Sequence, residues 1–212
     1  MKKIAIIGSG DLGQLIAHHL TASGNFEIAG FFDDYKDPNE LVGHHPVIGG
    51  IEDIVSNHAS GKFSALFMAI GYKHMSVRES LFSRFSKTIG FESFVHSSCW
   101  VDPTCHLGSG VVVLPGCVLD RGVSLKDNVL LNVGCVIAHD SSVGEGSFFG
   151  PRVSVAGFTA VGRNCFIGIG TVIKDNIVIC DSAQTGAGAV VCKSIDTPGV
   201  YLGVPARRVE RV

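Results

Sequence analysis

A repeat of six residues runs through the second half of the chain. From Val95 onward the sequence divides into consecutive units such as VLPGCV and IKDNIV, and the register never slips. The first position is aliphatic in every unit except those that begin with Phe149 and Thr185, and the fifth position holds only Cys, Val, Ser, Thr, Ile or Ala. Short repeats with a fixed period form solenoids in which each unit packs on its neighbours. The pattern therefore predicts a parallel β-helix with first and fifth side chains inside.

The cysteines follow the same repeat. All seven lie between Cys99 and Cys192, and there is no C-x-x-C motif. Five of them occupy the fifth position of a unit: Cys99, Cys105, Cys117, Cys135 and Cys165. A free cysteine packs as a small hydrophobic side chain. We therefore expect core residues here and neither disulfides nor a metal site.

Residues 1–94 follow a different pattern. A short apolar strand leads into the G-x-G-x-x-G motif of residues 8–13, which opens an amphipathic helix. The apolar segments FEIAGFF, PVIGG and SALFMAI then alternate with helices that begin near Ile51 and His74. This alternation predicts a small parallel sheet, with room for little more than one half of a dinucleotide-binding fold. We expect two domains, residues 1–94 and residues 95–212, the second including a C-terminal tail.

The glycine motif is typical of phosphate binding. Glycine amides and the positive end of a helix hold a phosphate well. Asp33 follows the second strand, where an acidic residue would bind a ribose hydroxyl in an NAD site. However, a repeat domain follows residue 94, and no second nucleotide half or hydride-transfer domain is present. The first domain is therefore predicted to bind a nucleotide without NAD chemistry.

His139 and Asp140 interrupt a repeat that small, aliphatic and turn-forming residues alone could satisfy. His139 is the third residue of its unit, outside the two inward positions, so its ring should face outward. Histidine is the usual general base, and a neighbouring carboxylate can orient its ring. The pair is therefore a candidate catalytic site. The remaining histidines show no spacing typical of metal ligands, so we expect no metal.

The whole chain resembles the PglD/NeuD-like sugar acetyltransferases, a branch of the hexapeptide-repeat acyltransferases. The repeat, the glycine motif, FFDD, AIGYKHMSVR, the His-Asp pair and the closing YLGVPARRV carry the resemblance. It implies an α/β N-terminal Rossmann-like half domain followed by a left-handed parallel β-helix, in which three units form a turn and residues 18 apart stack. His139 would then lie over Gly157. The resemblance also implies a homotrimer with active sites between adjacent coils.

The resemblance also assigns site residues. His139 and Asp140 would be catalytic, and acetyl-CoA would contact Gly157, Ile169, Ala187 and Phe148, the last of which replaces a histidine found in relatives. The nucleotide-linked sugar would contact the following residues: Gly8, Ser9, Gly10, Asp11, Asp33, Asp34, Gly71, Arg78 and Asn132. Three alternatives stay open: Arg78 as a solvated helix residue, Asp34 as an ordinary turn residue, and Asn132 as a corner residue with positive φ. A direct bond between Asp140 and His139 requires a corner between them, because successive strand side chains point to opposite faces.

The resemblance implies an acetyl-CoA-dependent N-acetyltransferase that acts on the 4-amino group of a UDP- or dTDP-linked 4-amino-4,6-dideoxy sugar in surface-glycan biosynthesis. Sugar O-acetylation of the sialic-acid type and a non-catalytic nucleotide-binding scaffold are the alternatives. The net charge is −2 and the 17 basic residues are scattered, which argues against nucleic-acid and membrane-surface partners. Glycines interrupt the first apolar run, so we expect no membrane insertion and a cytoplasmic protein.

Overall fold

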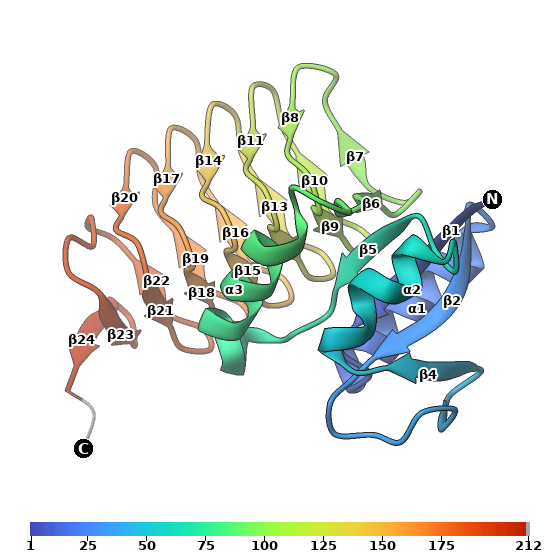
Figure 1. Ribbon diagram of the computed structural model, residues 1–212. Helices are drawn as coiled ribbons and strands as arrows, with labels where there is room; N and C mark the ends of the chain where they lie inside the picture. The colour runs from blue at the N-terminus through green and yellow to red at the C-terminus, as the bar shows by residue number, and fades with distance from the viewer. Residues whose placement is uncertain (211–212) are drawn as a thin grey trace. The chain divides into compact units, whose positions relative to one another are not determined.

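The computed structural model describes residues 1–210, so the last two residues of the predicted second domain, Arg211 and Val212, lie outside the described residues. The chain divides into two compact units, Met1–Ser93 and a unit that begins at Phe94 (Figure 1). This boundary falls one residue before the expected one. The reason is that Phe94 already belongs to the coil: its amide donates to the Val111 carbonyl at 2.8 Å.

The first unit is built on a sheet of five strands in the order β3-β4-β2-β1-β5. Its strands are β1 (Lys2–Ile7), β2 (Phe26–Phe32), β3 (Leu41–Val42), β4 (His45–Gly49) and β5 (Ala65–Met68). β1, β2, β4 and β5 are parallel, as the alternation of strands and helices predicts. β3 differs, because only two residues separate it from β4, and a link this short joins antiparallel strands.

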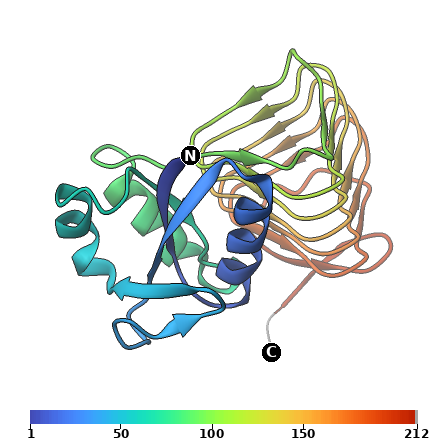
Figure 2. The ribbon, with the colours of Figure 1, turned by 90° about the vertical axis from the view of Figure 1, so that its right-hand side faces the viewer.

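Helices cover both faces of this sheet. They are α1 (Asp11–Ser23), η1 (Ile51–Asp53), α2 (Ile54–Ala59), η2 (Tyr72–His74) and α3 (Met75–Phe85). Figure 2 shows α1 on one side of the strands and α2 and α3 on the other. Ile54 of α2 and Phe82 and Phe85 of α3 share an apolar cluster with Ala5 and Ile7 of β1. None of the helices within residues 1–210 is long and apolar enough to cross a membrane.

The second unit is a coil whose strands form three sheets, parallel except for the final antiparallel pair β23–β24. From β6 to β19, each strand pairs with the strand 18 residues further on, as Val118 pairs with Val136. Three units therefore make one turn. The strands are β6 (Phe94–Val95), β7 (Trp100–Val101), β8 (His106–Leu107), β9 (Val112–Val113), β10 (Val118–Leu119), β11 (Ser124–Leu125), β12 (Leu130–Leu131), β13 (Val136–Ile137), β14 (Ser142–Val143), β15 (Phe148–Phe149), β16 (Ser154–Val155), β17 (Ala160–Val161), β18 (Phe166–Ile167), β19 (Val172–Ile173), β20 (Val178–Ile179), β21 (Ala183–Thr185), β22 (Val190–Val191), β23 (Gly199–Leu202) and β24 (Arg207–Val209).

The inside of the coil contains the residues that the repeat predicts. First-position side chains from Val113 to Val191 and fifth-position side chains from Val111 to Ile195 are buried. The cysteines are free; Cys117, Cys135 and Cys165 lie in this core, and Cys99 and Cys105 pack against it. The prediction that the repeated cysteines are core residues is thus confirmed.

The corners of the coil have one backbone conformation in common. From Gly110 to Gly188, every fourth position of a unit has a positive φ. Glycine, asparagine, aspartate and serine fill nearly all of these positions, as expected for residues that enter the left-handed region at low cost. The exceptions are Arg152 and Phe158. Most third and fourth residues of the units thus project from the corners, although Asn128 is buried.

Candidate active site

His139 follows β13 and lies at a corner of the coil. Its side chain is 42% exposed, so it does not fill the core. Asp140 has a φ of 57° and turns the chain at this point. As a result, His139 Nδ1 donates a hydrogen bond to Asp140 Oδ2 at 3.0 Å. The corner that a direct bond between neighbouring residues requires is therefore present.

Arg121 holds the same carboxylate from the preceding coil. Its Nη2 donates to Asp140 Oδ2 at 3.0 Å. The hydrogen bonds from His139 and then from Arg121 hold the pKa of Asp140 below its usual range. Asp140 is therefore an ionised acceptor, which requires the proton on Nδ1 of His139 and leaves Nε2 as a proton acceptor.

The role of Arg121 was missed at the sequence level. The signal was available, because Arg121 precedes His139 by 18 residues and so occupies the same corner one coil earlier. Together with Asp120, these two residues line a hollow of about 300 Å³. The imidazole thus borders an open space that a reactant could enter.

The following coil bounds the other side of the imidazole. A Cβ built on Gly157 would lie 2.7 Å from His139 Cε1 and 2.8 Å from Nε2. The predicted stacking of His139 over Gly157 is thus confirmed, and only glycine leaves room for the ring. The Phe158 ring meets the imidazole edge to face, with the two centroids 5.0 Å apart.

The other predicted acetyl-CoA residues lie elsewhere on the coil. Ile169, which is 51% exposed, and Ala187, which is also exposed, follow strands of the sheet that contains β18 and β21. His139 follows a strand of a different sheet, so the structure does not bring these residues to its corner. Phe148 is 5% exposed, and its ring packs against Phe166. The contact of these residues with acetyl-CoA stays a prediction.

Asn132 does not have the corner conformation that was one alternative for it. In the coil, positive φ values occur at the fourth residue of a unit. Asn132 is the second residue of its unit and does not have a positive φ. Its Oδ1 accepts a hydrogen bond from the Val133 amide at 2.8 Å. The corner alternative is therefore wrong, and contact of Asn132 with the sugar stays a prediction.

The glycine motif lies between β1 and α1 in the first unit. Gly8 has a φ of 96°, and a Cβ on Gly13 would lie 2.1 Å from the Gly8 carbonyl oxygen, so both positions require glycine. The buried Ser9 donates to Asp33 Oδ2 through its amide at 3.0 Å and its hydroxyl at 2.5 Å. Burial alone would raise the pKa of Asp33, but the hydrogen bonds from Ser9 and the Tyr35 amide outweigh it and lower the pKa. An ionised Asp33 thus holds the loop that contains Gly10 and Asp11.

The remaining predicted nucleotide residues lie at the same edge of the sheet. The glycine motif, Asp33 with Asp34, and Gly71 follow β1, β2 and β5, which are parallel neighbours. Asp34 Oδ1 accepts the Ile51 amide at 2.7 Å, where η1 begins. The structure thus brings these residues together at the carboxyl edge, where open α/β sheets bind ligands.

Arg78 is not a solvated helix residue. It is 1% exposed, and its Nη1 donates to the Ile70 carbonyl at 3.1 Å. Burial lowers its pKa to about 9. Arg78 therefore holds the chain immediately before Gly71, and its direct contact with a ligand stays a prediction.

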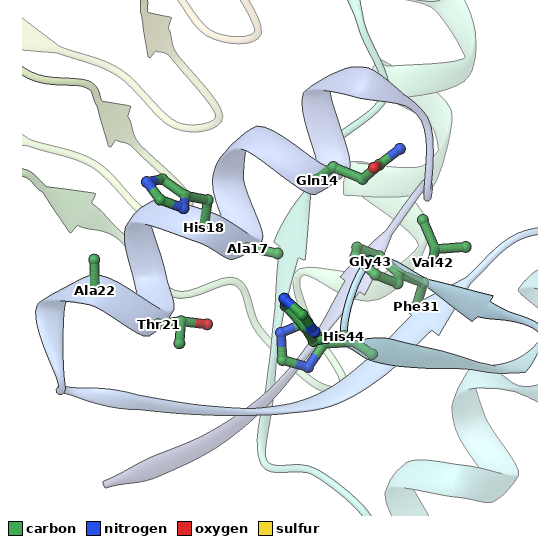
Figure 3. Close-up of a pocket in the computed structure, with 10 residues that line it drawn as sticks. Gln14, Ala17, His18, Thr21, Ala22, Phe31, Val42, Gly43 and His44 are labelled. Atoms are coloured by element: carbon green, nitrogen blue, oxygen red, sulfur yellow. The ribbon is translucent and has the colours of Figure 1, made fainter.

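Another hollow lies in the first unit, between α1 and the β3–β4 hairpin (Figure 3). It has a volume of about 510 Å³ and an apolar floor that includes Ala17 and Phe31, with His18, His44 and His45 among its lining residues. Burial lowers the pKa of His45. The hollow contains none of the predicted nucleotide residues. Within residues 1–210, no group of three or more His, Cys, Asp or Glu side chains could hold a metal ion.

Comparison with known proteins gives a family for the first unit and full-length structural matches for the chain. Residues 3–85 match the PglD N-terminal domain family. No curated protein matches the chain significantly. Several solved structures match nearly the whole chain, and three of them are informative about this site.

PerB from Caulobacter crescentus, in complex with CoA and GDP-perosamine, is 27% identical, with 99% of this chain and 98% of PerB covered and a TM-score of 0.91. A variant of perosamine N-acetyltransferase from Caulobacter crescentus, with the same two ligands, is 28% identical, with 100% and 98% covered and a TM-score of 0.92. The acetyltransferase domain of PglB from Neisseria gonorrhoeae FA1090, in complex with acetyl coenzyme A, is 27% identical, with 98% and 99% covered and a TM-score of 0.89.

The fold and the full-length structural matches identify an acyltransferase in which a Rossmann-like half domain precedes a left-handed parallel β-helix of hexapeptide repeats. The match of residues 3–85 and the full-length structural matches carry the assignment one step further. Residues 3–85 belong to the PglD N-terminal domain family, and the whole chain is similar to the sugar acetyltransferases of the PglD/NeuD-like family.

Proposed function

We propose that this enzyme transfers the acetyl group of acetyl-CoA to the 4-amino group of a nucleotide-linked 4-amino-4,6-dideoxy sugar. The observation that carries the proposal is the outward-facing His139, whose Nδ1 is bonded to an ionised Asp140 and which itself lines an open hollow. The structural relatives support it, since they were solved with CoA and GDP-perosamine or with acetyl coenzyme A.

In this mechanism His139 acts first as a base and then as an acid. Nε2 takes a proton from the amine as the amine nitrogen bonds to the thioester carbonyl carbon. The C–S bond then breaks, and the departing CoA sulfur takes the proton from Nε2. Asp140 stabilises the imidazolium between these steps, and Arg121 keeps the carboxylate in place. The chain ends the cycle in the protonation state in which it began.

The nucleotide is proposed to bind at the carboxyl edge of the first-unit sheet. The backbone amides of the Gly8–Asp11 loop and the N-terminus of α1 are suited to a diphosphate. Asp33 orders this loop and is ionised. UDP and dTDP are the nucleotides that the family resemblance implies, and GDP joins them because two relatives were solved with GDP-perosamine.

Acceptor screening tests this function. Thermal shifts with UDP-, dTDP- and GDP-linked amino sugars identify the ligand, because a ligand that binds only the folded state stabilises it. The best ligand is then incubated with acetyl-CoA, and the product is analysed by mass spectrometry and NMR. We expect an N-acetylated sugar and a loss of about 10² to 10⁴ in kcat for His139→Ala, with little change in nucleotide-sugar affinity. An acetyl ester in the product would favour O-acetylation, and a His139→Ala protein within about threefold of wild type would place the base elsewhere.

We also propose that the enzyme is a homotrimer in the cytoplasm. One chain offers only one side of the His139 corner, whose ring and neighbouring hollow face outward. A neighbouring copy would supply the second wall. Light scattering at micromolar concentration should give three chains per particle, and a fully active monomer would contradict this proposal.

A further inference from the structure

Phe158 has an unusual backbone conformation for its residue type. Its φ is 56°, the left-handed value shared by all fourth-position corners from Gly110 to Gly188. Such values suit glycine, asparagine and aspartate, whereas a bulky residue is strained there. Residues held in this way cluster at functional sites. A glycine or asparagine would satisfy the corner with less strain, so the coil itself does not require phenylalanine.

The Phe158 side chain does not contribute to the core either. It is 57% exposed, and it projects from the coil that follows His139. Its ring meets the imidazole at an interplanar angle of 86°. A large apolar side chain is therefore held in strain, partly in solvent, beside the proposed base.

The surroundings of Nε2 show what this ring can do. Asp120 and Arg121 make the preceding coil polar and charged, and Asp140 engages Nδ1. On the following coil Gly157 has no side chain, so the Phe158 ring is the apolar surface beside the imidazole. The amine must approach Nε2, and the acyl carbon must lie about 3–3.5 Å from the amine. The apolar tail of the acyl group therefore lies near this surface.

We propose that Phe158 is a specificity-determining residue that limits the length of the transferred acyl group. Its ring packs against the acetyl methyl and occupies the space that a longer acyl chain needs. This inference rests on the proposed function of the His139 corner. It goes beyond that function because it assigns the choice of acyl donor to a residue outside the His139–Asp140 pair.

Two variants test the proposal without threatening the fold. Phe158→Asn and Phe158→Gly suit the left-handed corner, so their Tm should equal or exceed that of the wild type. Arg152→Asn is the matched control, because Arg152 has a φ of 58° at the same position of the preceding unit. The measurement is kcat/KM for acetyl-, propionyl- and butyryl-CoA with the best amino-sugar acceptor.

The wild type should prefer acetyl-CoA by about 10- to 200-fold for each added methylene, the usual range for a hydrophobic pocket. Both Phe158 variants should reduce this preference at least about tenfold, whereas Arg152→Asn should keep it. An unchanged preference in the Phe158 variants would overturn the proposal. So would an equal loss of rate with every donor, which would show that the ring only positions His139, or loss of the trimer with the preference intact.

A binding measurement separates this inference from the proposed function. Calorimetry with acetyl-CoA and propionyl-CoA needs no acceptor, and the ratio of their Kd values should move toward one in Phe158→Asn. If the wild type acetylates no amino sugar, the proposed function fails, and the Kd ratio alone decides the role of Phe158. If the wild type is active and neither ratio changes, only the inference about Phe158 fails.

Discussion

Gly157→Ala places one methyl group against the proposed base and changes little else. The φ of Gly157 lies outside the left-handed region, so alanine adds no backbone strain. The atoms nearest to the new Cβ all belong to the His139 ring. That ring is 42% exposed and therefore has room to move away from the methyl group.

The size of the effect follows from the distances. The new Cβ would lie 2.7 Å from His139 Cε1, whereas ordinary contacts begin at 3.4 Å, so the ring must move by about 0.7 Å. This displacement also strains the 3.0 Å bond between Nδ1 and Asp140. A misplacement of about 1 Å costs roughly 10² in rate. We expect kcat to fall by about 10- to 100-fold, with an unchanged Tm and an unchanged KM for the sugar nucleotide.

The assay is steady-state acetyl transfer, with CoA release followed by a thiol reagent. Gly157→Ala is compared with His139→Ala and with the double variant, because a double-mutant cycle isolates effects that act through one group. In the His139→Ala background the added methyl should cause no further loss. A fully active Gly157→Ala enzyme, or equal losses in both backgrounds, would refute the assignment of His139 as a base that Gly157 accommodates.

Four further predictions concern the charged groups and the thiols. Asp140→Asn should lower kcat by less than His139→Ala does. Because the pKa of Asp140 is lowered, its protonation should not reduce the wild-type rate until the pH is below 3.8. A fall in the pH–rate profile at higher pH that disappears in Asp140→Asn would contradict this. Asp33→Ala should raise KM for the sugar nucleotide more than KM for acetyl-CoA. Because the folded-state pKa of Asp33 is lowered, its stabilising effect relative to Asp33→Asn should be present above pH 3.8 and disappear as the pH falls through the folded-state value, as measured by urea unfolding. The exposed Cys192 should react with a disulfide reagent before the buried Cys165, whose pKa burial raises to about 11, and equal rates would argue against the core position of Cys165.

The coil could be predicted from the sequence because its rules are local. Each unit repeats the same inward positions, so the burial of side chains such as Leu131 and Cys135 follows from their place in the unit. The stacking of His139 over Gly157 also follows, once the turn is known to contain three units. The grouping of the glycine motif, Asp33 and Gly71 at one edge of the first-unit sheet was also predictable, because the carboxyl ends of neighbouring parallel strands lie side by side.

Other features depend on contacts that no local pattern encodes. Nothing in the local sequence distinguishes Arg121 from any other surface arginine, whereas the structure shows its guanidinium donating a hydrogen bond to Asp140. Arg78 is a charged residue on a helix, which the sequence alone would leave in solvent. In the structure it is buried, and the Met68 and Ile70 carbonyls accept its hydrogen bonds. The strain at Phe158 was also missed, because the fourth-position rule allows glycine or a small polar residue but does not flag a phenylalanine.

The three-unit turn also makes the site sensitive to the number of repeats. If one six-residue unit were removed between His139 and Gly157, every later inward residue would still point inward, so the core would survive. Each later corner, however, would move to the next edge of the coil, and the glycine would no longer lie under the imidazole. Removal of three units would keep the edges aligned. In such a chain, whole turns are the steps by which length can change during evolution while the residues of one edge stay in line.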